Sequence, residues 1–197
     1  RPGLMALPDN PNGQHPSTGG LFDFSCPTGA PERAFDVTAI SAWTSLLDPA
    51  SPHYRRIMYN NRVDGGFGKL FDPTAILYLR TSDVDPLSDV GKPRPGVPIE
   101  PLVLRARAGE CIVLTLRNRV GERIHLDGFN TLPMLIDNFN ANALRPSEFV
   151  GLHPQLVYYD PSRYEGIPVG NNGAPTTGIV SPGQNITYKW YAGDIQI

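Results

Sequence analysis

Prolines and glycines divide this chain into many short apolar runs, and that division constrains the fold more than any other feature. The 197 residues include 21 prolines and 20 glycines, scattered between runs in which apolar and polar side chains alternate. Such alternation, with a period of two, is typical of a half-buried strand, and no stretch shows a sustained helical period. Hydrophobic residues make up 40% of the chain, which is enough for a core and argues against disorder. The sequence therefore predicts an all-β Greek-key sandwich.

Six runs are expected to supply the strands of this sandwich. They are residues 34–40, 75–79, 102–108, 111–118, 149–159 and 186–193. The third and fourth runs flank Gly109-Glu110, so they are expected to pair as an antiparallel hairpin. In the last run Ile186, Tyr188 and Trp190 fall on one face, which predicts that this face is buried.

Charge and hydropathy exclude several kinds of partner. A formal net charge of −2 gives no electrostatic basis for binding nucleic acid or an anionic membrane. No apolar stretch approaches the roughly 20 residues of a membrane-spanning helix. No signal peptide is visible at Arg1, so we expect a processed chain or a piece of a longer one. Residues 1–25 contain prolines and glycines without periodicity and are expected to form an extended N-terminal arm.

The chain contains two cysteines, Cys26 and Cys111. A single pair in an otherwise cysteine-poor chain fits one disulfide in an exported protein, or two unrelated buried thiols. There is no CxxC motif and no histidine nearby, so a zinc site or a thiol nucleophile is not expected. We predict a Cys26–Cys111 disulfide and an extracellular or periplasmic location.

Other site motifs are absent or incomplete. Asp83, Asp85 and Asp89 hint at a calcium loop, but the run lacks the glycine and the final acid of an EF-hand, so a solvated acidic turn is the simpler interpretation. Asn185-Ile186-Thr187 is a glycosylation sequon, which is meaningful only in a eukaryotic protein. No nucleophile elbow, P-loop or dinucleotide fingerprint supports a hydrolase or a nucleotide enzyme.

Several segments resemble, in the family's order, a cupredoxin domain of the multicopper oxidases. These segments are residues 101–118, Gly151-Leu152-His153-Pro154-Gln155-Leu156-Val157, Val169-Gly170-Asn171, Pro182-Gly183 and Tyr188-Lys189-Trp190-Tyr191-Ala192-Gly193. The nearest branch is that of the large bacterial manganese oxidases, with ceruloplasmin as a more distant relative. The resemblance covers about residues 26–194 and implies a cupredoxin-like Greek-key β-sandwich domain at residues 26–197.

The resemblance also implies copper, which the family holds with His-x-His pairs and with a cysteine flanked by histidines. Imidazole suits copper, and this spacing aims two rings at one side of a strand. The positions that match one pair are Leu152 and Pro154, which cannot bind a metal, with His153 between them. The cysteine strand would follow Trp190, and the chain stops at Ile197 before it. We therefore expect copper in the full assembly but no complete copper site on this chain.

His153 is the one histidine inside a family motif and is the candidate metal ligand of this chain. A lone histidine on a half-buried strand is more often structural than a ligand. His15, His53 and His125 lie far apart in the sequence, although folding can bring two histidines together. If the chain alone binds copper, His153 with His125 or His53 is the expected set.

Two functions from different classes follow. In the first, the chain is part of a secreted multicopper oxidase that couples oxidation of Mn(II), Fe(II) or a phenol to O2 reduction. It would be a structural or substrate-channel domain, not itself catalytic, whose partners are the rest of the precursor or neighbouring subunits. In the second, it is a metal-free cupredoxin-like structural or binding module of an extracellular assembly. The resembled domain has a further core strand after residues 188–192, so we expect another chain segment to complete this sandwich.

Overall fold

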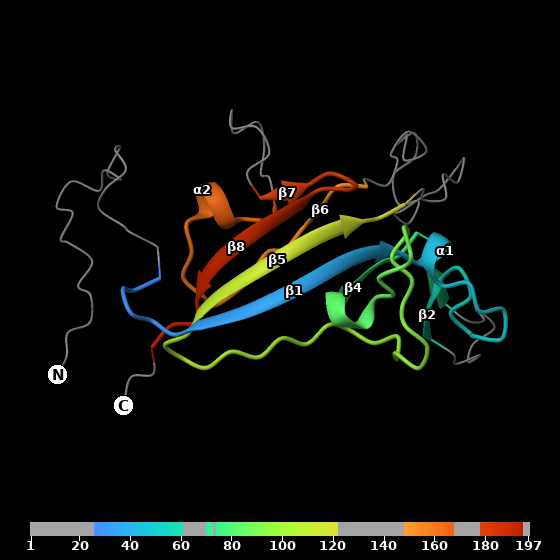
Figure 1. Cartoon of the computed structure of the whole chain (residues 1–197), viewed down its shortest axis with the longest axis horizontal. Coiled ribbons are helices and arrows are strands. Elements are labelled where there is room, and N and C mark those ends of the chain that lie inside the picture. Colours follow the sequence, from blue (N-terminus) through green and yellow to red (C-terminus); the bar gives the residue numbers. More distant parts are fainter. Residues whose placement is uncertain (1–25, 61–69, 73, 122–147, 168–177, 195–197) are drawn as a thin grey trace, which may run out of the picture.

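The computed structural model describes residues 26–60, 70–72, 74–121, 148–167 and 178–194. Its centre is a four-stranded sheet with the strand order β4-β1-β5-β8 (Figure 1). These strands are β1 (Glu32–Ser41), β4 (Ile76–Arg80), β5 (Cys111–Arg119) and β8 (Asn185–Tyr191). β1 runs antiparallel to β4 and parallel to β5, while β5 runs antiparallel to β8. Four of the six expected strands are therefore present close to their predicted positions.

Two short antiparallel pairs accompany this sheet. β2 (Ile57–Asn60) pairs with β3 (Leu70–Asp72), and β6 (Val150–Gly151) pairs with β7 (Ile179–Val180). Figure 1 shows the β6–β7 pair beside β5 and β8, and β2 at the end of the molecule where α1 lies.

Helix is scarce, and the prediction of an all-β fold is confirmed. In the described ranges it is confined to α1 (Ala42–Ser45), α2 (Pro161–Tyr164) and a 3-10 turn at Thr81–Asp83. None of these helices is long and apolar enough to cross a membrane.

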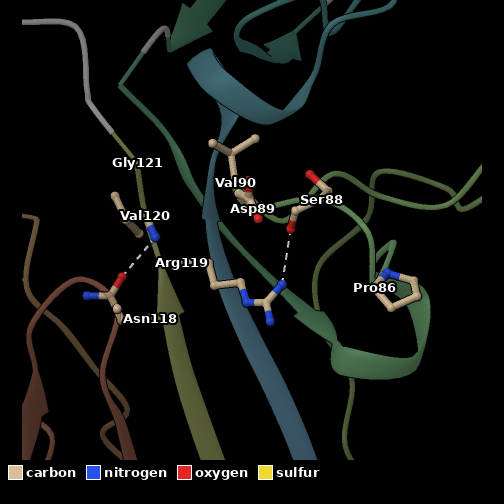
Figure 2. Close-up of a pocket in the computed structure, with 9 residues that line it drawn as sticks. Pro86, Ser88, Asp89, Val90, Asn118, Arg119, Val120 and Gly121 are labelled. Atoms are coloured by element: carbon tan, nitrogen blue, oxygen red, sulfur yellow. Dashed lines mark hydrogen bonds between the residues drawn. The ribbon is translucent and has the colours of Figure 1, made fainter.

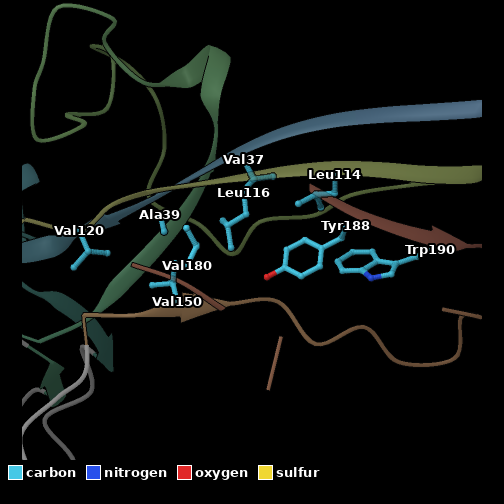
Figure 3. Close-up of a cluster of buried hydrophobic side chains, with 9 residues drawn as sticks. All are labelled: Val37, Ala39, Leu114, Leu116, Val120, Val150, Val180, Tyr188 and Trp190. Carbon is cyan, nitrogen blue, oxygen red and sulfur yellow. The ribbon is translucent and has the colours of Figure 1, made fainter. Parts of the chain in front are cut away.

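The main core lies on the face of the sheet that the β6–β7 pair covers. Cross-strand register places Leu116 beside Val37 and Leu114 beside Tyr188, so alternate residues of three strands share this face. Tyr188 is fully buried, and its ring stacks on that of Trp190 with the centroids 5.1 Å apart. The buried residues of this cluster are drawn in Figure 3: Val37, Ala39, Leu114, Leu116, Val120, Val150, Val180, Tyr188 and Trp190. Burying each large apolar side chain contributes about 1.5–3 kcal/mol.

The opposite face of the sheet is apolar at one end only. Ile40, Leu79 and Val84 form a small buried cluster there. Farther along, Arg117 donates to both carboxylate oxygens of Asp36, at 2.8 and 2.9 Å. One buried face and one polar face produce the period-two alternation from which the strands were predicted.

The predicted hairpin between residues 102–108 and 111–118 is wrong. β5 has β1 on one edge and β8 on the other, so no edge remains for residues 102–108. These residues lie outside the strands, and Leu102 and Leu104 pack against the main core cluster. The turn itself is present, since Gly109 has a φ of 84° and donates its N–H to the carbonyl of Gly193 at 2.6 Å.

Residues 149–159 do not form the continuous strand that was predicted. They contain β6 and, separately, one bridge in which Tyr158 and Tyr191 exchange backbone hydrogen bonds of 2.9 and 2.8 Å. Between these two, Leu156 has a φ of 61°, which takes the chain out of the extended conformation. The apolar alternation of this run serves packing against the core rather than pairing in a sheet.

The Cys26–Cys111 disulfide is confirmed. It spans 85 residues and joins the chain ahead of β1 to the first residue of β5. Glu110, beside this disulfide, accepts hydrogen bonds from Arg33 Nε at 3.0 Å and from the N–H of Arg107 at 2.7 Å. The segment ahead of β1 is thus joined covalently to the start of β5, and an ion pair joins Arg33 of β1 to Glu110. The proposed arm, residues 1–25, lies outside the described residues.

Candidate functional site

Three glycines let the segments around β6, α2 and β7 touch through their backbones. A Cβ atom on Gly151 would lie 2.2 Å from the carbonyl oxygen of Gly166, and one on Gly178 would lie 1.5 Å from that of Glu165. No side chain fits at such distances, so these positions require glycine. The close approach places Glu165, which follows α2, beside His153, which follows β6.

His153, Tyr159 and Glu165 form a hydrogen-bonded cluster, called here the His153 cluster. Nδ1 of His153 bonds one carboxylate oxygen of Glu165, and the hydroxyl of Tyr159 donates to the other at 2.6 Å. The side chain of His153 is 37% exposed and that of Glu165 is 19% exposed. The cluster therefore meets solvent mainly through the histidine.

The contacts within the His153 cluster fix two protonation states. Burial raises the pKa of Glu165, but the hydrogen bonds from Tyr159 and His153 outweigh it and hold that pKa below its ordinary value. The hydrogen bond to Glu165, helped by burial, raises the pKa of Tyr159 to about 12. Near neutral pH Glu165 is therefore a carboxylate and Tyr159 is a protonated phenol.

This arrangement orients the imidazole of His153. Because the carboxylate of Glu165 holds Nδ1, the neutral ring keeps its proton there and directs the lone pair of Nε2 elsewhere. A histidine held in this way can accept a proton or bind a metal ion through Nε2. Across the described parts of the chain, no three His, Cys, Asp or Glu side chains gather where they could hold a metal ion. Metal binding by His153 stays a prediction.

The other candidate histidines are not brought to this cluster in the described ranges. His53 lies in the turn ahead of β2, where its Nδ1 accepts the backbone N–H of Met58 at 3.2 Å. His15 and His125 lie outside the described residues.

The described side chains do not form a copper centre of the multicopper-oxidase type. Cys26 and Cys111 are joined in a disulfide, so neither supplies a thiolate. Leu152 packs against the core cluster, and Pro154 has no donor atom. One imidazole that is already bonded to a carboxylate is too small a donor set for such a centre.

The side chains of Asp83 and Asp85 in the acidic turn at residues 83–89 bond to neighbouring groups of the chain. The carboxylate of Asp85 accepts the N–H of Leu87 at 3.0 Å, and the hydroxyl of Ser82 donates to Asp83 at 3.2 Å. This local pattern is that of a solvated turn, the simpler of the two interpretations.

Asn185 of the glycosylation sequon is exposed at the first residue of β8.

An open pocket of about 340 Å³ lies between the acidic turn and the end of β5 (Figure 2). Arg119 crosses it and donates to the carbonyl of Ser88 at 3.1 Å, and its stem lies against Gly91. Asn118, on the other side, bonds to backbone groups only. These contacts tie the turn to the sheet, which is a structural role. No sequence motif predicts this pocket. None predicts that Glu165 and Tyr159 bond to each other beside His153 either.

No protein-family model matches this chain, and no curated protein sequence matches it.

Proposed function

We propose that this chain is a cupredoxin-like domain of a secreted multicopper oxidase, where it shapes the substrate channel or holds the assembly together. The main support for this proposal is that several segments that resemble a cupredoxin domain pack against one another in the structure. Residues 101–118 and 188–193 contribute β5 and β8, which lie side by side with Leu114 opposite Tyr188. Residues 151–157 pack on the same core through Leu152 and Val157.

In this proposal the redox chemistry belongs to other parts of the assembly. The positions that match paired ligands carry Leu152 and Pro154, and His153 between them is bonded to Glu165. Oxidation of Mn(II), Fe(II) or a phenol, and reduction of O2, would take place in other domains or subunits. This domain would shape the substrate channel, stabilise the assembly and provide a surface to which other domains attach.

An extracellular or periplasmic location is part of the proposal. Disulfides persist in oxidising compartments and are rare in the cytosol of most organisms, and Cys26 and Cys111 are joined.

A second candidate is a metal-free cupredoxin-like module in an extracellular structural or binding assembly. This candidate is favoured by the state of the possible metal ligands. Both cysteines form a disulfide, and the imidazole of His153 bonds the carboxylate of Glu165.

Isolation of the protein from its source separates the two functions. The measurements are the mass of the intact covalent chain, the copper content, and O2 uptake with Mn(II), Fe(II) or a phenol. The oxidase proposal expects copper, and either a chain much longer than 197 residues or a bound partner rich in His-x-His motifs. It also expects His153→Ala to leave the copper content unchanged.

A copper-free product of this length without oxidase activity would support the second candidate instead. If the isolated chain held one or more tight copper ions, the assignment of a purely structural domain would be wrong. The His153 variant would then identify the ligand.

A further inference from the structure

A turn ahead of β2 holds two adjacent arginines on aromatic rings. The guanidinium carbon of Arg55 lies 4.9 Å from the ring centroid of Trp43 and 5.6 Å from that of Tyr54. That of Arg56 lies 3.8 Å from the ring centroid of Phe71. Nε of Arg55 also donates to the hydroxyl of Tyr54 at 3.2 Å. Stacking orients both guanidinium groups, so each loses less conformational freedom when it binds an anion.

The backbone at Arg55 adopts a conformation that suits glycine better than arginine. Its φ is 55°, and its N–H donates to the carbonyl of Leu46 at 2.7 Å. A side chain in this region costs stability, whereas glycine adopts it readily. Such an outlier motivates a hypothesis of function for the side chain, although Leu156 shares this conformation at a φ of 61°.

The positive charge of this turn is not neutralised within the described ranges. Neither Arg55 nor Arg56 takes part in the ion pairs found there. Asp48 and Asp72, on either side of the turn in the sequence, accept backbone N–H groups at 2.9 and 2.7 Å.

We propose that this turn binds an oxyanion, with the guanidinium groups of Arg55 and Arg56 as the donors. A guanidinium offers two parallel N–H groups to two oxygens of a carboxylate, sulfate or phosphate. The simpler interpretation is that the arginines only cover apolar rings. That interpretation accounts for the stacking but leaves both guanidinium groups without an anionic partner among the described residues. The site belongs to the β2–β3 end of the molecule and does not depend on the proposed oxidase function.

The test is a fluorescence titration of the whole chain at low ionic strength with two probes. Sodium sulfate supplies a free oxyanion, and a tetraglutamate peptide supplies carboxylates on a polypeptide. Sodium chloride of equal ionic strength and a tetraglutamine peptide are the controls. Trp43 reports directly, because Arg55 lies on its ring, and a Trp43→Phe variant separates its signal from that of the buried Trp190. Isothermal titration calorimetry gives a second readout that needs no tryptophan.

The expected result is a saturable change with either oxyanion probe and none with its control. Arg55→Gly should weaken binding by about tenfold, the ratio that one charge-assisted hydrogen bond provides. Its Tm should be no lower than that of the parent, because glycine relieves the positive φ. Arg56→Gln should also weaken binding, whereas Arg105→Gln, at an exposed site on another segment, should not.

The relative affinities identify the source of the anion. Tighter binding of tetraglutamate indicates an acidic segment of a partner polypeptide, and equal or tighter binding of sulfate indicates a free oxyanion. The absence of a saturable response to both probes would overturn the proposal. So would binding that Arg55→Gly and Arg56→Gln leave unchanged. A lower Tm for Arg55→Gly would also count against it, because the arginine would then serve the fold.

Discussion

Glu110 is the side chain that holds the starts of two strands together. It pairs with Arg33 and accepts the backbone N–H of Arg107, and the hydrogen bond from Arg33 is the main reason that its pKa falls from 4.5 to about 2. Because the pKa is lower in the folded state, the stabilisation is fully present above pH 4.5. It is lost as the pH falls through about 2.

We predict that Glu110→Gln flattens the acid limb of the stability curve. The parent should lose free energy of unfolding between pH 4.5 and about 2, and the variant should lose less over that window. Urea unfolding at a series of pH values measures this. Glu100→Gln, at an exposed glutamate, is the control and should keep the slope of the parent. Equal slopes in Glu110→Gln and the parent would show that this ion pair does not shape acid stability.

The His153 cluster gives a prediction at the opposite end of the pH scale. The pKa of Tyr159 is raised from 10.0 to about 12, chiefly by its hydrogen bond to Glu165. A raised pKa means that the stabilisation is present below pH 10.0 and is lost as the pH rises through about 12. Glu165→Gln should therefore lower the pKa of Tyr159, which ultraviolet titration of tyrosinate measures. Tyr159→Phe identifies the step, and an unshifted step in Glu165→Gln would contradict the role of this carboxylate.

At the scale of elements, Asn118 joins the sheet to the pair that covers it. Its side chain donates to the carbonyls of Glu148 and Val180, both at 2.8 Å, and accepts the N–H of Val120 at 2.9 Å. Asn118→Ala leaves these three backbone groups without their side-chain partner, and those of Val120 and Val180 belong to buried residues. We expect the free energy of unfolding to fall by about 3 kcal/mol or more. Urea unfolding measures the loss, and Asn185→Ala, at an exposed asparagine, should cost far less.

The disulfide links elements that are far apart in the sequence. In the chain-entropy model, a disulfide that closes a loop of 85 residues restricts the unfolded chain and so stabilises the folded state by about 4–5 kcal/mol. The double variant Cys26→Ala, Cys111→Ala should lose free energy of unfolding of this order, as should the reduced parent. Denaturant unfolding with and without reductant compares them. A reductant that destabilises the cysteine-free variant equally would show that the effect does not come from this bond.

Strand positions could be predicted from the sequence, but strand neighbours could not. The alternation in residues 34–40, 111–118 and 186–193 reports one buried face, which each of these strands has whatever its partner, and the short run 75–79 was predicted from its continuous apolar character. The partner of β5 was misassigned because the local turn at Gly109 favours a hairpin, whereas the edge is occupied by the distant β1 in parallel register. Parallel pairing leaves no local signal.

The candidate site was predictable only in part for the same reason. His153 stands within a motif, but Glu165 and Tyr159 reach it because the chain folds back through backbone contacts at Gly166 and Gly178. A glycine in a sequence permits such an approach without naming its partner. The stacking of Arg55 and Arg56 could not be predicted from the sequence either. The rings on which they stack, Trp43 and Phe71, come from other segments of the chain.

At the scale of the whole molecule, β8 is the outermost strand on its side of the main sheet. The N–H of Ala192 and the carbonyl of Gln184 bond to the β5 side, at 3.0 and 2.9 Å. Because bonding direction alternates along a strand, the N–H groups of Thr187 and Lys189 point to the outer edge. Among the described residues, Tyr158 alone pairs with this edge by a backbone bridge, at Tyr191. An edge of this kind is a template for a further strand.

We predict that another polypeptide segment adds to β8, and that Thr187→Pro prevents it. Proline at position 187 removes an outward N–H and leaves the backbone hydrogen bonds to β5 in place. It also removes the exposed hydroxyl contact with Thr115 at 3.2 Å, which costs little, so the variant should unfold at nearly the parent's Tm. Ile186→Pro, whose N–H faces β5, is the matched control and should be strongly destabilised. For residues 26–197 expressed alone, sedimentation equilibrium should show concentration-dependent association in the parent and a shift toward monomer in Thr187→Pro. A parent that stays a soluble, cooperatively unfolding monomer at every concentration would show that the sandwich needs no strand from elsewhere.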